Sequence, residues 1–334
     1  MLVIAVLLAH AALLAGPAPR LLARARWTSR FPRAALRTWH ACAAGLLVSL
    51  AAALVLTAHD LWEHGMVWLF NADKHQVHAA YGGAWLAADI AEAALLVLLL
   101  GAGTLSAVTL RRSLRLRRDR DRHRLTADAQ SAYSPCVASA EYAGSADPAV
   151  RVLDHHAPAA FCIPGPRGDS RIVVTSAAVE MLSGDELAAT LEHERAHLRL
   201  RHHRSILVAD ILTAALGWTG PLRDYADHVR RLAEMAADDQ AVRRHGRRTV
   251  AKALLEMSTA PAAGPGAPGL SAMTGPDPAE RIRRLIHAPP RPASRLVPAL
   301  ALTATLAVPV LPVAVAMVPA ALLADTAHPV SSRH

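Results

Sequence analysis

Residues 193–197 read His-Glu-Arg-Ala-His, and these residue types at this spacing could hold a metal ion and activate water. On a helix, side chains four residues apart lie on one face, so His193 and His197 could bind one cation together. Glu194, beside the first histidine, could take a proton from an attacking water molecule. This pattern is typical of zinc-dependent peptidases, whose catalytic ion usually has three protein ligands and one open position.

A third ligand is therefore expected elsewhere in the chain, and Glu234 is the best candidate. It lies between positions 230 and 242, in the segment RRLAEMAADDQAV, which consists largely of good helix formers. Asp238 follows four residues later on the same face, where its carboxylate could hydrogen-bond a ligand histidine and fix its tautomer. From the residues alone, an exposed acidic helix face explains Glu234 and Asp238 equally well. We expect Asp239 to belong to such a face.

The residues around the motif predict the helix that must carry it. Ser183 and Glu186 have the spacing of a capping box, which predicts a helix start at Asp185 or one residue to either side. An apolar stripe at helical spacing follows, made of Leu187, Leu191 and Leu198. The competing interpretation is a basic surface helix with incidental histidines, as His202 and His203 could be.

The composition indicates a membrane protein. Hydrophobic residues make up 53% of the 334 residues, and the mean hydropathy is positive, at +0.23. The apolar residues gather in blocks at 2–16, 38–58 and 83–110 before the motif, and at 296–324 after it. About 20 apolar residues are needed to cross a bilayer, so the first block is short unless it extends to Pro19. In the third block, the two acids Asp89 and Glu92 suggest that the span itself begins near residue 93.

The charges between the blocks predict one orientation. The segments 20–37, 111–124 and 281–295 are rich in arginine, whereas 59–82 carries three acids and one lysine. Basic loops stay in the cytoplasm, so the amino terminus and the tail 325–334 are expected outside and the domain at 111–295 inside. Arginines follow the first apolar block rather than precede it, which argues against a cleaved signal peptide. The net charge of +9 could also suggest nucleic-acid binding. Because the basic segments adjoin the ends of the apolar blocks, direct nucleic-acid binding is not expected.

Within the domain at 111–295, residues 159–163 and 171–176 are expected to pair as a β-hairpin around a Pro/Gly turn. The apolar segment 205–218 is only 14 residues long and contains Asp210, so a buried or membrane-resting helix is expected rather than a span. Residues 259–279 are rich in proline and glycine and predict a loop. Cysteines occur at 42, 136 and 162 without a Cys-x-x-Cys pair, so neither a disulfide framework nor a thiolate zinc site is expected.

HERAH followed by EMAAD resembles the HExxH…ExxxD pattern of the gluzincin membrane peptidases. The hairpin before the motif and the segment DPAERIRRLI at 277–286 resemble the flanking parts of their protease domain. The order of elements is most similar to the BlaR/MecR group of integral membrane metallopeptidases. The resemblance implies a mainly α membrane protein with four transmembrane helices and a cytoplasmic α+β metallopeptidase domain between the third and fourth.

The same resemblance implies one Zn²⁺ per chain held by His193, His197 and Glu234, with Glu194 as the catalytic base. Its substrate would be a cytoplasmic protein, such as a BlaI/MecI-type transcriptional repressor cut in response to an outside signal. Unlike the drug-sensing members, this chain shows no Ser-x-x-Lys penicillin-binding domain, so it is not expected to sense β-lactams through an acylated domain.

Two other functions remain open. One is a quality-control or processing peptidase of the HtpX or CAAX-protease type, which shares this site. The other is a non-catalytic membrane sensor or scaffold with a degenerate site. A second donor for the reaction's oxyanion is expected, for which Tyr225, His202 and an arginine within 242–248 are candidates.

Overall fold

The computed structural model describes residues 2–57, 88–131, 150–165, 169–260, 277–287 and 296–327, together with positions 71, 73, 75 and 76. The first part of the chain forms α1 (Leu2–Ala15), α2 (Pro17–Arg24), α3 (Arg26–Arg30), α4 (Pro32–Thr57) and α7 (Ala88–Ser131). Three strands follow, β1 (Val150–Leu153), β2 (Ala160–Ile163) and β3 (Arg171–Thr175). The remaining helices are α8 (Ser176–Met181), α9 (Gly184–Arg199), α10 (His202–Leu216), α11 (Tyr225–His245), α12 (Arg247–Thr259), α13 (Pro278–His287) and α14 (Leu296–Ala327), with a short 3₁₀ turn η3 (Gly217–Thr219) after α10.

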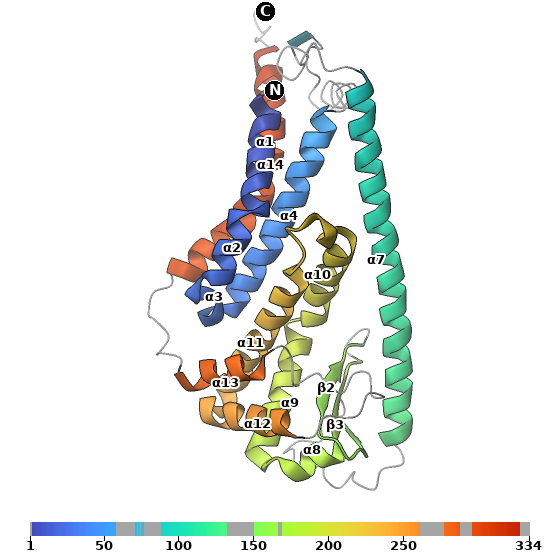
Figure 1. Ribbon diagram of the computed structural model, residues 1–334, viewed down its shortest axis with the longest axis vertical. Coiled ribbons are helices and arrows are strands. Elements are labelled where there is room, and N and C mark those ends of the chain that lie inside the picture. Colours follow the sequence, from blue (N-terminus) through green and yellow to red (C-terminus); the bar gives the residue numbers. More distant parts are fainter. Residues whose placement is uncertain are drawn as a thin grey trace, which may run out of the picture.

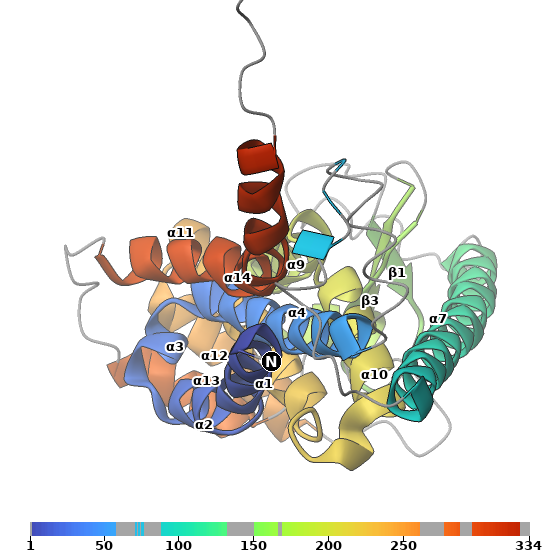
Figure 2. The same cartoon turned by 90° about the horizontal axis from the view of Figure 1, so that it is seen from above.

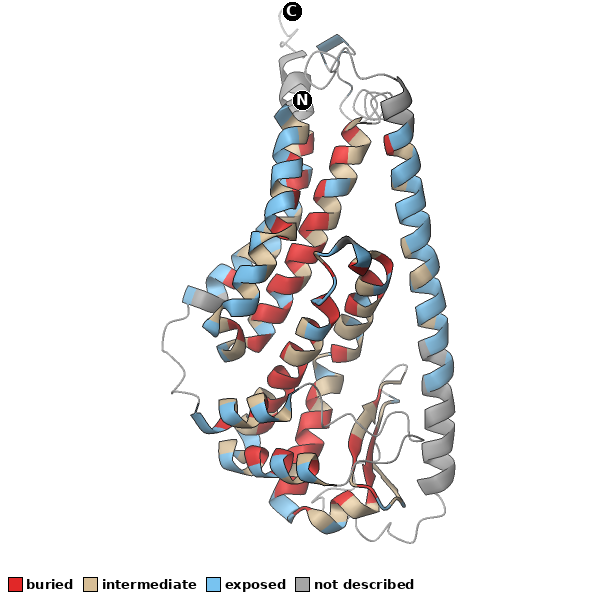
Figure 3. Ribbon diagram, in the orientation of Figure 1, coloured by how far each residue is buried: buried red, intermediate tan, exposed pale blue. Residues whose placement is uncertain are grey.

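Among the described residues, four segments are long and apolar enough to cross a membrane, as expected for a multi-pass membrane protein. They are Leu2–Arg24, Pro32–Thr57, Ala93–Arg115 and Ala299–Met317. In Figure 1, α1, α4 and α14 run side by side, while α7 runs along the opposite side of the molecule and contacts α4, α10 and β1. The view from above agrees (Figure 2). Exposed residues cover much of α1 and α7, and buried residues concentrate in α4, α9 and α11 (Figure 3).

The span boundaries differ from the predicted blocks in informative ways. The first span does not end at residue 16, because the helix resumes at Pro17 and reaches Arg24. Proline is favourable at this position, since its fixed φ suits a first helical turn and its missing N–H has no helical partner there. The helix of the third predicted block, α7, starts at Ala88, and residues 83–87 lie outside the described residues. It continues through the basic segment to Ser131, where strong helix formers without proline or glycine allow it to extend.

The membrane helices pack closely where one residue has no side chain. A Cβ added to Gly45 of α4 would lie 2.6 Å from Val308 Cγ1 on α14 and 2.9 Å from Leu14 Cδ1 on α1. Small residues of this kind let helix backbones approach in a bilayer, where apolar contact alone gives little preference for protein over lipid. Gly45 therefore marks the contact among three of the candidate spans.

The predicted hairpin is confirmed. β2 pairs antiparallel with β3, with Cys162 opposite Ile172. β1 was not predicted; it pairs parallel with β3 on its other side, so the order in the described sheet is β1-β3-β2. β2 therefore lies at the edge of this sheet, and α9 packs against it.

The segment 205–218 is a helix of the domain, as expected, and not one of the candidate spans among the described residues. α10 packs against α7 and α11, and Ala209 and Leu212 join a core cluster with Trp39 of α4 and Val229 of α11. This cluster joins the membrane helices to the domain. The predicted loop at 259–279 lies largely outside the described residues.

Candidate metal centre

The helix that carries the motif begins where its capping residues predict. The Ser183 amide donates a hydrogen bond of 2.9 Å to Glu186 Oε2, and the Ser183 side chain accepts from the backbone of the third helical residue. Together they complete a capping box before Gly184, within the predicted range. Lys252 of α12 lies 2.5 Å from the other Glu186 oxygen, which ties the start of α9 to a neighbouring helix.

A second helix places two carboxylates opposite the motif. α9 packs against α11, and both Glu234 and Asp238 are buried on the same face of α11. His193 and Glu194 are buried on α9, and the His197 side chain is 13% exposed. The alternative interpretation of an exposed acidic face is therefore excluded at these two positions. Asp239, which was expected on such an exposed face, departs from that expectation, because it is half-buried and accepts a hydrogen bond of 2.6 Å from Arg284.

His193, His197 and Glu234 converge on one point. His193 Nε2 and His197 Nε2 are 3.1 Å apart, and Glu234 Oε2 and Oε1 lie 3.4 Å and 3.5 Å from them, respectively. Ligands about 2.0–2.1 Å from a tetrahedral zinc ion are separated by about 3.3–3.4 Å. The three side chains could therefore hold one such ion with little movement.

The charge around these residues also fits a divalent cation. Three carboxylates are buried here, those of Glu194, Glu234 and Asp238, and the guanidinium of Arg281 is buried beside them. If both histidines are neutral, as metal binding requires, and Glu194 is ionised, two negative charges remain among these described groups. Isolated charges are strongly unfavourable in a protein interior, and a dication would balance this pair. Glu234 Oε2 is also buried and accepts no hydrogen bond in the described structure, although a guanidinium nitrogen of Arg281 lies 3.0 Å from it.

Asp238 lies behind the first histidine. Its Oδ1 is 3.1 Å from His193 Nδ1, the ring nitrogen that faces away from His197. A carboxylate at this nitrogen favours a proton on Nδ1 and leaves Nε2 as the ligand atom. Burial lowers the pKa of His193, but the two neighbouring carboxylates outweigh it and raise the pKa to about 9.

Arg281 was not predicted as a site residue, yet it joins both carboxylates of α11. Its Nε and Nη2 donate hydrogen bonds of 2.9 Å and 2.6 Å to Asp238, and its Nη1 lies 3.0 Å from Glu234 Oε2. Burial raises the pKa of Glu234, but the hydrogen bond with His193 and the electrostatic interactions with His197 and Arg281 outweigh it and lower the pKa to about 2. A sequence signal existed, because Arg281 shares a helical face with the buried Leu285.

His202 lies behind the second histidine. Its Nδ1 is 3.2 Å from His197 Nδ1, and it is fully buried, so it is not an incidental surface residue. Burial lowers the pKa of His197 to about 4 and that of His202 to about 3, so both rings are neutral. One ring must then donate to the other. If His197 donates from Nδ1, its Nε2 carries no proton, and the lone pair on this nitrogen faces Glu234 and His193.

Glu194 has the environment of a proton acceptor at neutral pH. Burial raises its pKa to about 7, with opposing effects from His193, which lowers it, and Glu234, which raises it. The Cys162 thiol on β2 hydrogen-bonds this carboxylate and also lowers the pKa of Glu194. Burial raises the pKa of Cys162 well above its usual value, so this residue is a neutral thiol at physiological pH. The contact between Cys162 and Glu194 was not predicted, because it depends on how the sheet packs against α9.

Comparison with known families agrees with this geometry. Residues 123–288 match the model of Peptidase family M48. This segment is an M48 peptidase domain. It contains every residue of the centre, from Cys162 on β2 to Arg281 on α13. No curated protein and no solved structure matches the chain. The M48 domain implies a metallopeptidase that acts on protein or peptide substrates, and the apolar helices indicate that it is membrane-associated.

Tyr225, one of the residues considered as oxyanion donors, serves a different contact. Its hydroxyl hydrogen-bonds His40 on α4, and its ring is buried in the cluster that joins α4 to α11. His202 is placed behind His197, as described above. Neither residue therefore emerges as an oxyanion donor from the described geometry.

Proposed function

We propose that this protein is a membrane-embedded, zinc-dependent endopeptidase. His193, His197 and Glu234 would hold one Zn²⁺, Asp238 would support His193, and Glu194 would act as general base. The observation that carries the proposal is the meeting of three ligand atoms from α9 and α11 within 4.8 Å of one another, at the separations of a tetrahedral zinc site.

A zinc ion in such a site lowers the pKa of water and polarises a carbonyl group. Glu194 would accept the proton from the attacking water and then pass it to the leaving amine. A pKa near 7 suits both steps, because the carboxylate can bind and release a proton at neutral pH. Asp238 would fix the tautomer of His193, and His202 would do the same for His197.

The position of β2 suggests how a substrate would bind. β2 is the edge of the described sheet nearest to α9, and Cys162 on it contacts Glu194. An extended peptide could add to this edge through main-chain hydrogen bonds, which would bring its backbone alongside the catalytic centre. Binding of this kind recognises the main chain of the peptide and does not require a free terminus. It therefore favours cleavage within a chain, by an endopeptidase.

We further propose that the peptidase domain at 111–295 faces the cytoplasm, between the third and fourth spans. The arginine-rich segments at both ends of this domain support the orientation. The substrate would then be a cytoplasmic protein, such as a transcriptional repressor of the BlaI/MecI type. Because the family match is to M48 and not specifically to the BlaR/MecR group, a quality-control or processing peptidase of the HtpX or CAAX-protease type is the second candidate.

The catalytic proposal is tested with Glu194→Gln in the purified full-length protein. We expect one zinc per chain, as in the wild type, and a loss of activity on an unstructured protein by a factor of about 10² to 10⁴, the usual contribution of a general base. Glu180→Gln, an exposed glutamate on α8, is the control and should retain both zinc and activity. Normal turnover by Glu194→Gln would remove Glu194 from its role, and a wild type without bound zinc would overturn the metal assignment.

Two further measurements address orientation and substrate. Reporter tags inserted between residues 261 and 276 should be inaccessible from outside intact cells, and accessibility would refute the cytoplasmic assignment. Proteins captured by the Glu194→Gln variant in membranes would distinguish the two candidates. A repressor supports regulation, and misfolded or lipid-modified membrane proteins support quality control or processing.

A further inference from the structure

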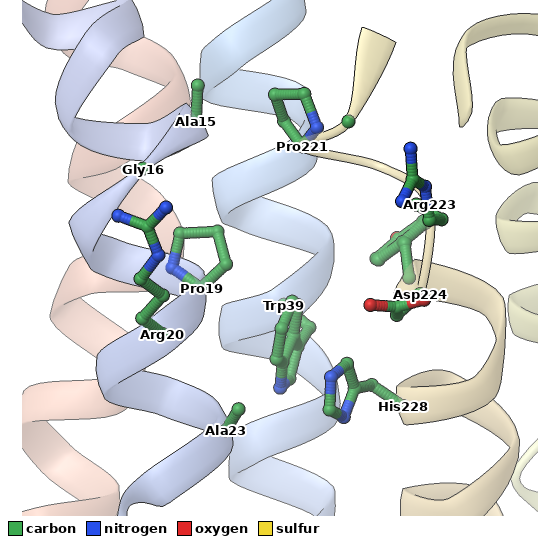
Figure 4. Close-up of a pocket in the computed structure, with 12 residues that line it drawn as sticks. Ala15, Gly16, Pro19, Arg20, Ala23, Trp39, Pro221, Arg223, Asp224 and His228 are labelled. Carbon is green, nitrogen blue, oxygen red and sulfur yellow. The ribbon is translucent and has the colours of Figure 1, made fainter. Parts of the chain in front are cut away.

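A cavity lies where the membrane helices meet the peptidase domain. It has a volume of about 510 Å³ and is formed by α2, α4 and the loop that leads from η3 into α11 (Figure 4). Its lining includes Arg20, four residues before the end of the first candidate span, and Trp39, near the start of the second. The cavity is therefore at the level of lipid headgroups on the side of the M48 domain.

The walls carry charges of both signs. Arg20 extends from α2 and Arg223 from the loop on the opposite side, and Asp224 directs its carboxylate into the space between them (Figure 4). All three side chains are exposed, and neither guanidinium is paired with a carboxylate in the part of the chain that the structure describes. His228 stacks on Trp39 with ring centroids 4.5 Å apart, and its pKa is lowered by burial, so it adds no charge at neutral pH.

We infer that this cavity binds the headgroup of a membrane phospholipid, with its phosphodiester at Arg20 and Arg223 and an ammonium group at Asp224. Guanidinium groups bind phosphate through charge-assisted hydrogen bonds, and basic pockets between membrane helices are typical lipid-headgroup sites. Two cationic side chains and one anionic side chain match a zwitterionic headgroup such as phosphoethanolamine. An anionic headgroup such as phosphoglycerol would meet the same arginines but would be repelled by Asp224.

The surroundings favour a lipid over a free phosphate ester. Ala15, Pro19 and Ala23 give the cavity an apolar wall on the side of α1 and α2, along which an acyl chain could run. Trp218, in η3 just before the loop, is 81% exposed, and tryptophan is enriched at the interfaces of membranes with water. Both features are explained if the tip between α10 and α11 lies at the membrane surface.

A lipid bound here would connect the membrane to the candidate metal centre. The cavity is bounded by the first turn of α11, the helix that also carries Glu234 and Asp238. Occupancy would therefore hold the amino-terminal end of α11 against α2 and α4. The binding itself does not depend on the proposed peptidase activity, and the Glu194→Gln variant should bind lipid as the wild type does.

The test is lipid binding by purified full-length protein in detergent, measured by native mass spectrometry with added dioleoyl-phosphatidylethanolamine, dioleoyl-phosphatidylglycerol or inorganic phosphate. The wild type should retain one phosphatidylethanolamine in preference to phosphatidylglycerol. Arg20→Gln/Arg223→Gln should weaken this binding at least about tenfold, because two charge-assisted hydrogen-bonding groups are lost. Asp224→Asn should remove the preference between the two lipids.

Matched variants separate local recognition from charge and folding. Arg24→Gln/Arg204→Gln removes the same charge from exposed positions on α2 and α10 outside the cavity and should leave binding within about twofold of the wild type, since screened surface charges contribute little. Arg20→Lys/Arg223→Lys keeps the charges and should retain measurable binding. Equal lipid binding by the wild type and the glutamine variant would overturn the proposal. Inorganic phosphate that displaces the lipid at equal concentration would overturn the assignment to a phospholipid.

Discussion

Replacing Arg281 with methionine would remove a buried charge from the centre while keeping most of the volume of the side chain. Arg281 is 1% exposed and contacts two carboxylates that are themselves buried, Asp238 through two hydrogen bonds and Glu234 at 3.0 Å. Methionine can fill the space of the aliphatic stem but cannot compensate either negative charge. The variant therefore leaves both carboxylates uncompensated in the interior.

The size of the effect depends on whether a cation is bound. Breaking a buried ion pair by removing one partner lowers the free energy of unfolding by about 3–5 kcal/mol. For a domain of this size, this corresponds to a decrease in melting temperature of roughly 6–20 °C. A bound dication would offset part of the loss, because it would be held by Glu234 and would attract both carboxylates. We therefore expect Arg281→Met to destabilise the protein much more in the presence of a chelator than in the presence of zinc.

Thermal unfolding of the full-length protein in detergent, with zinc or with EDTA, measures this difference in destabilisation. Arg284→Met is the matched control on the same helix, since Arg284 pairs with Asp239, which is not part of the three-residue cluster. Its smaller loss of stability should be the same with and without zinc. If Arg281→Met lost equal stability in both conditions, or none, the proposed charge compensation between Arg281 and the cation would be refuted.

Two further predictions concern the support of α9. His202→Phe keeps a ring of similar size but removes the nitrogen 3.2 Å from His197, so zinc affinity should fall by about 10–100-fold in competition with a fluorescent chelator. His203→Phe should leave the affinity unchanged, and an equal loss in both variants would point to general disruption of α10. Ser183→Ala removes half of the capping box and should lower the free energy of unfolding by about 1 kcal/mol, measured as faster hydrogen exchange in the first turn of α9. Unchanged exchange in this first turn would show that the contact of Lys252 with Glu186 stabilises the start of α9 without the cap.

Local signals in the sequence were sufficient to predict those features of the structure that depend only on residues close together in the chain. The capping box located the start of α9, and the four-residue spacing put His193 and His197 on one face, because both follow from the geometry of a single helix. The apolar blocks located four candidate spans, since crossing a bilayer requires a long run of apolar residues in one segment. Their ends were less certain, because helices extend through any residues that do not break them.

The sequence by itself determined the membrane segments, the motif helix and the type of chemistry that its histidines and glutamate could perform. The tertiary structure alone brought Asp238 within 3.1 Å of His193, buried Arg281 from a helix 43 residues further along, and placed the Cys162 strand beside Glu194. Periodicity along a chain defines which side chains share a face, but not which other element packs on that face. That choice depends on burial and on the balance of charge across contacts that are distant in sequence, and it is decided only when the whole domain folds.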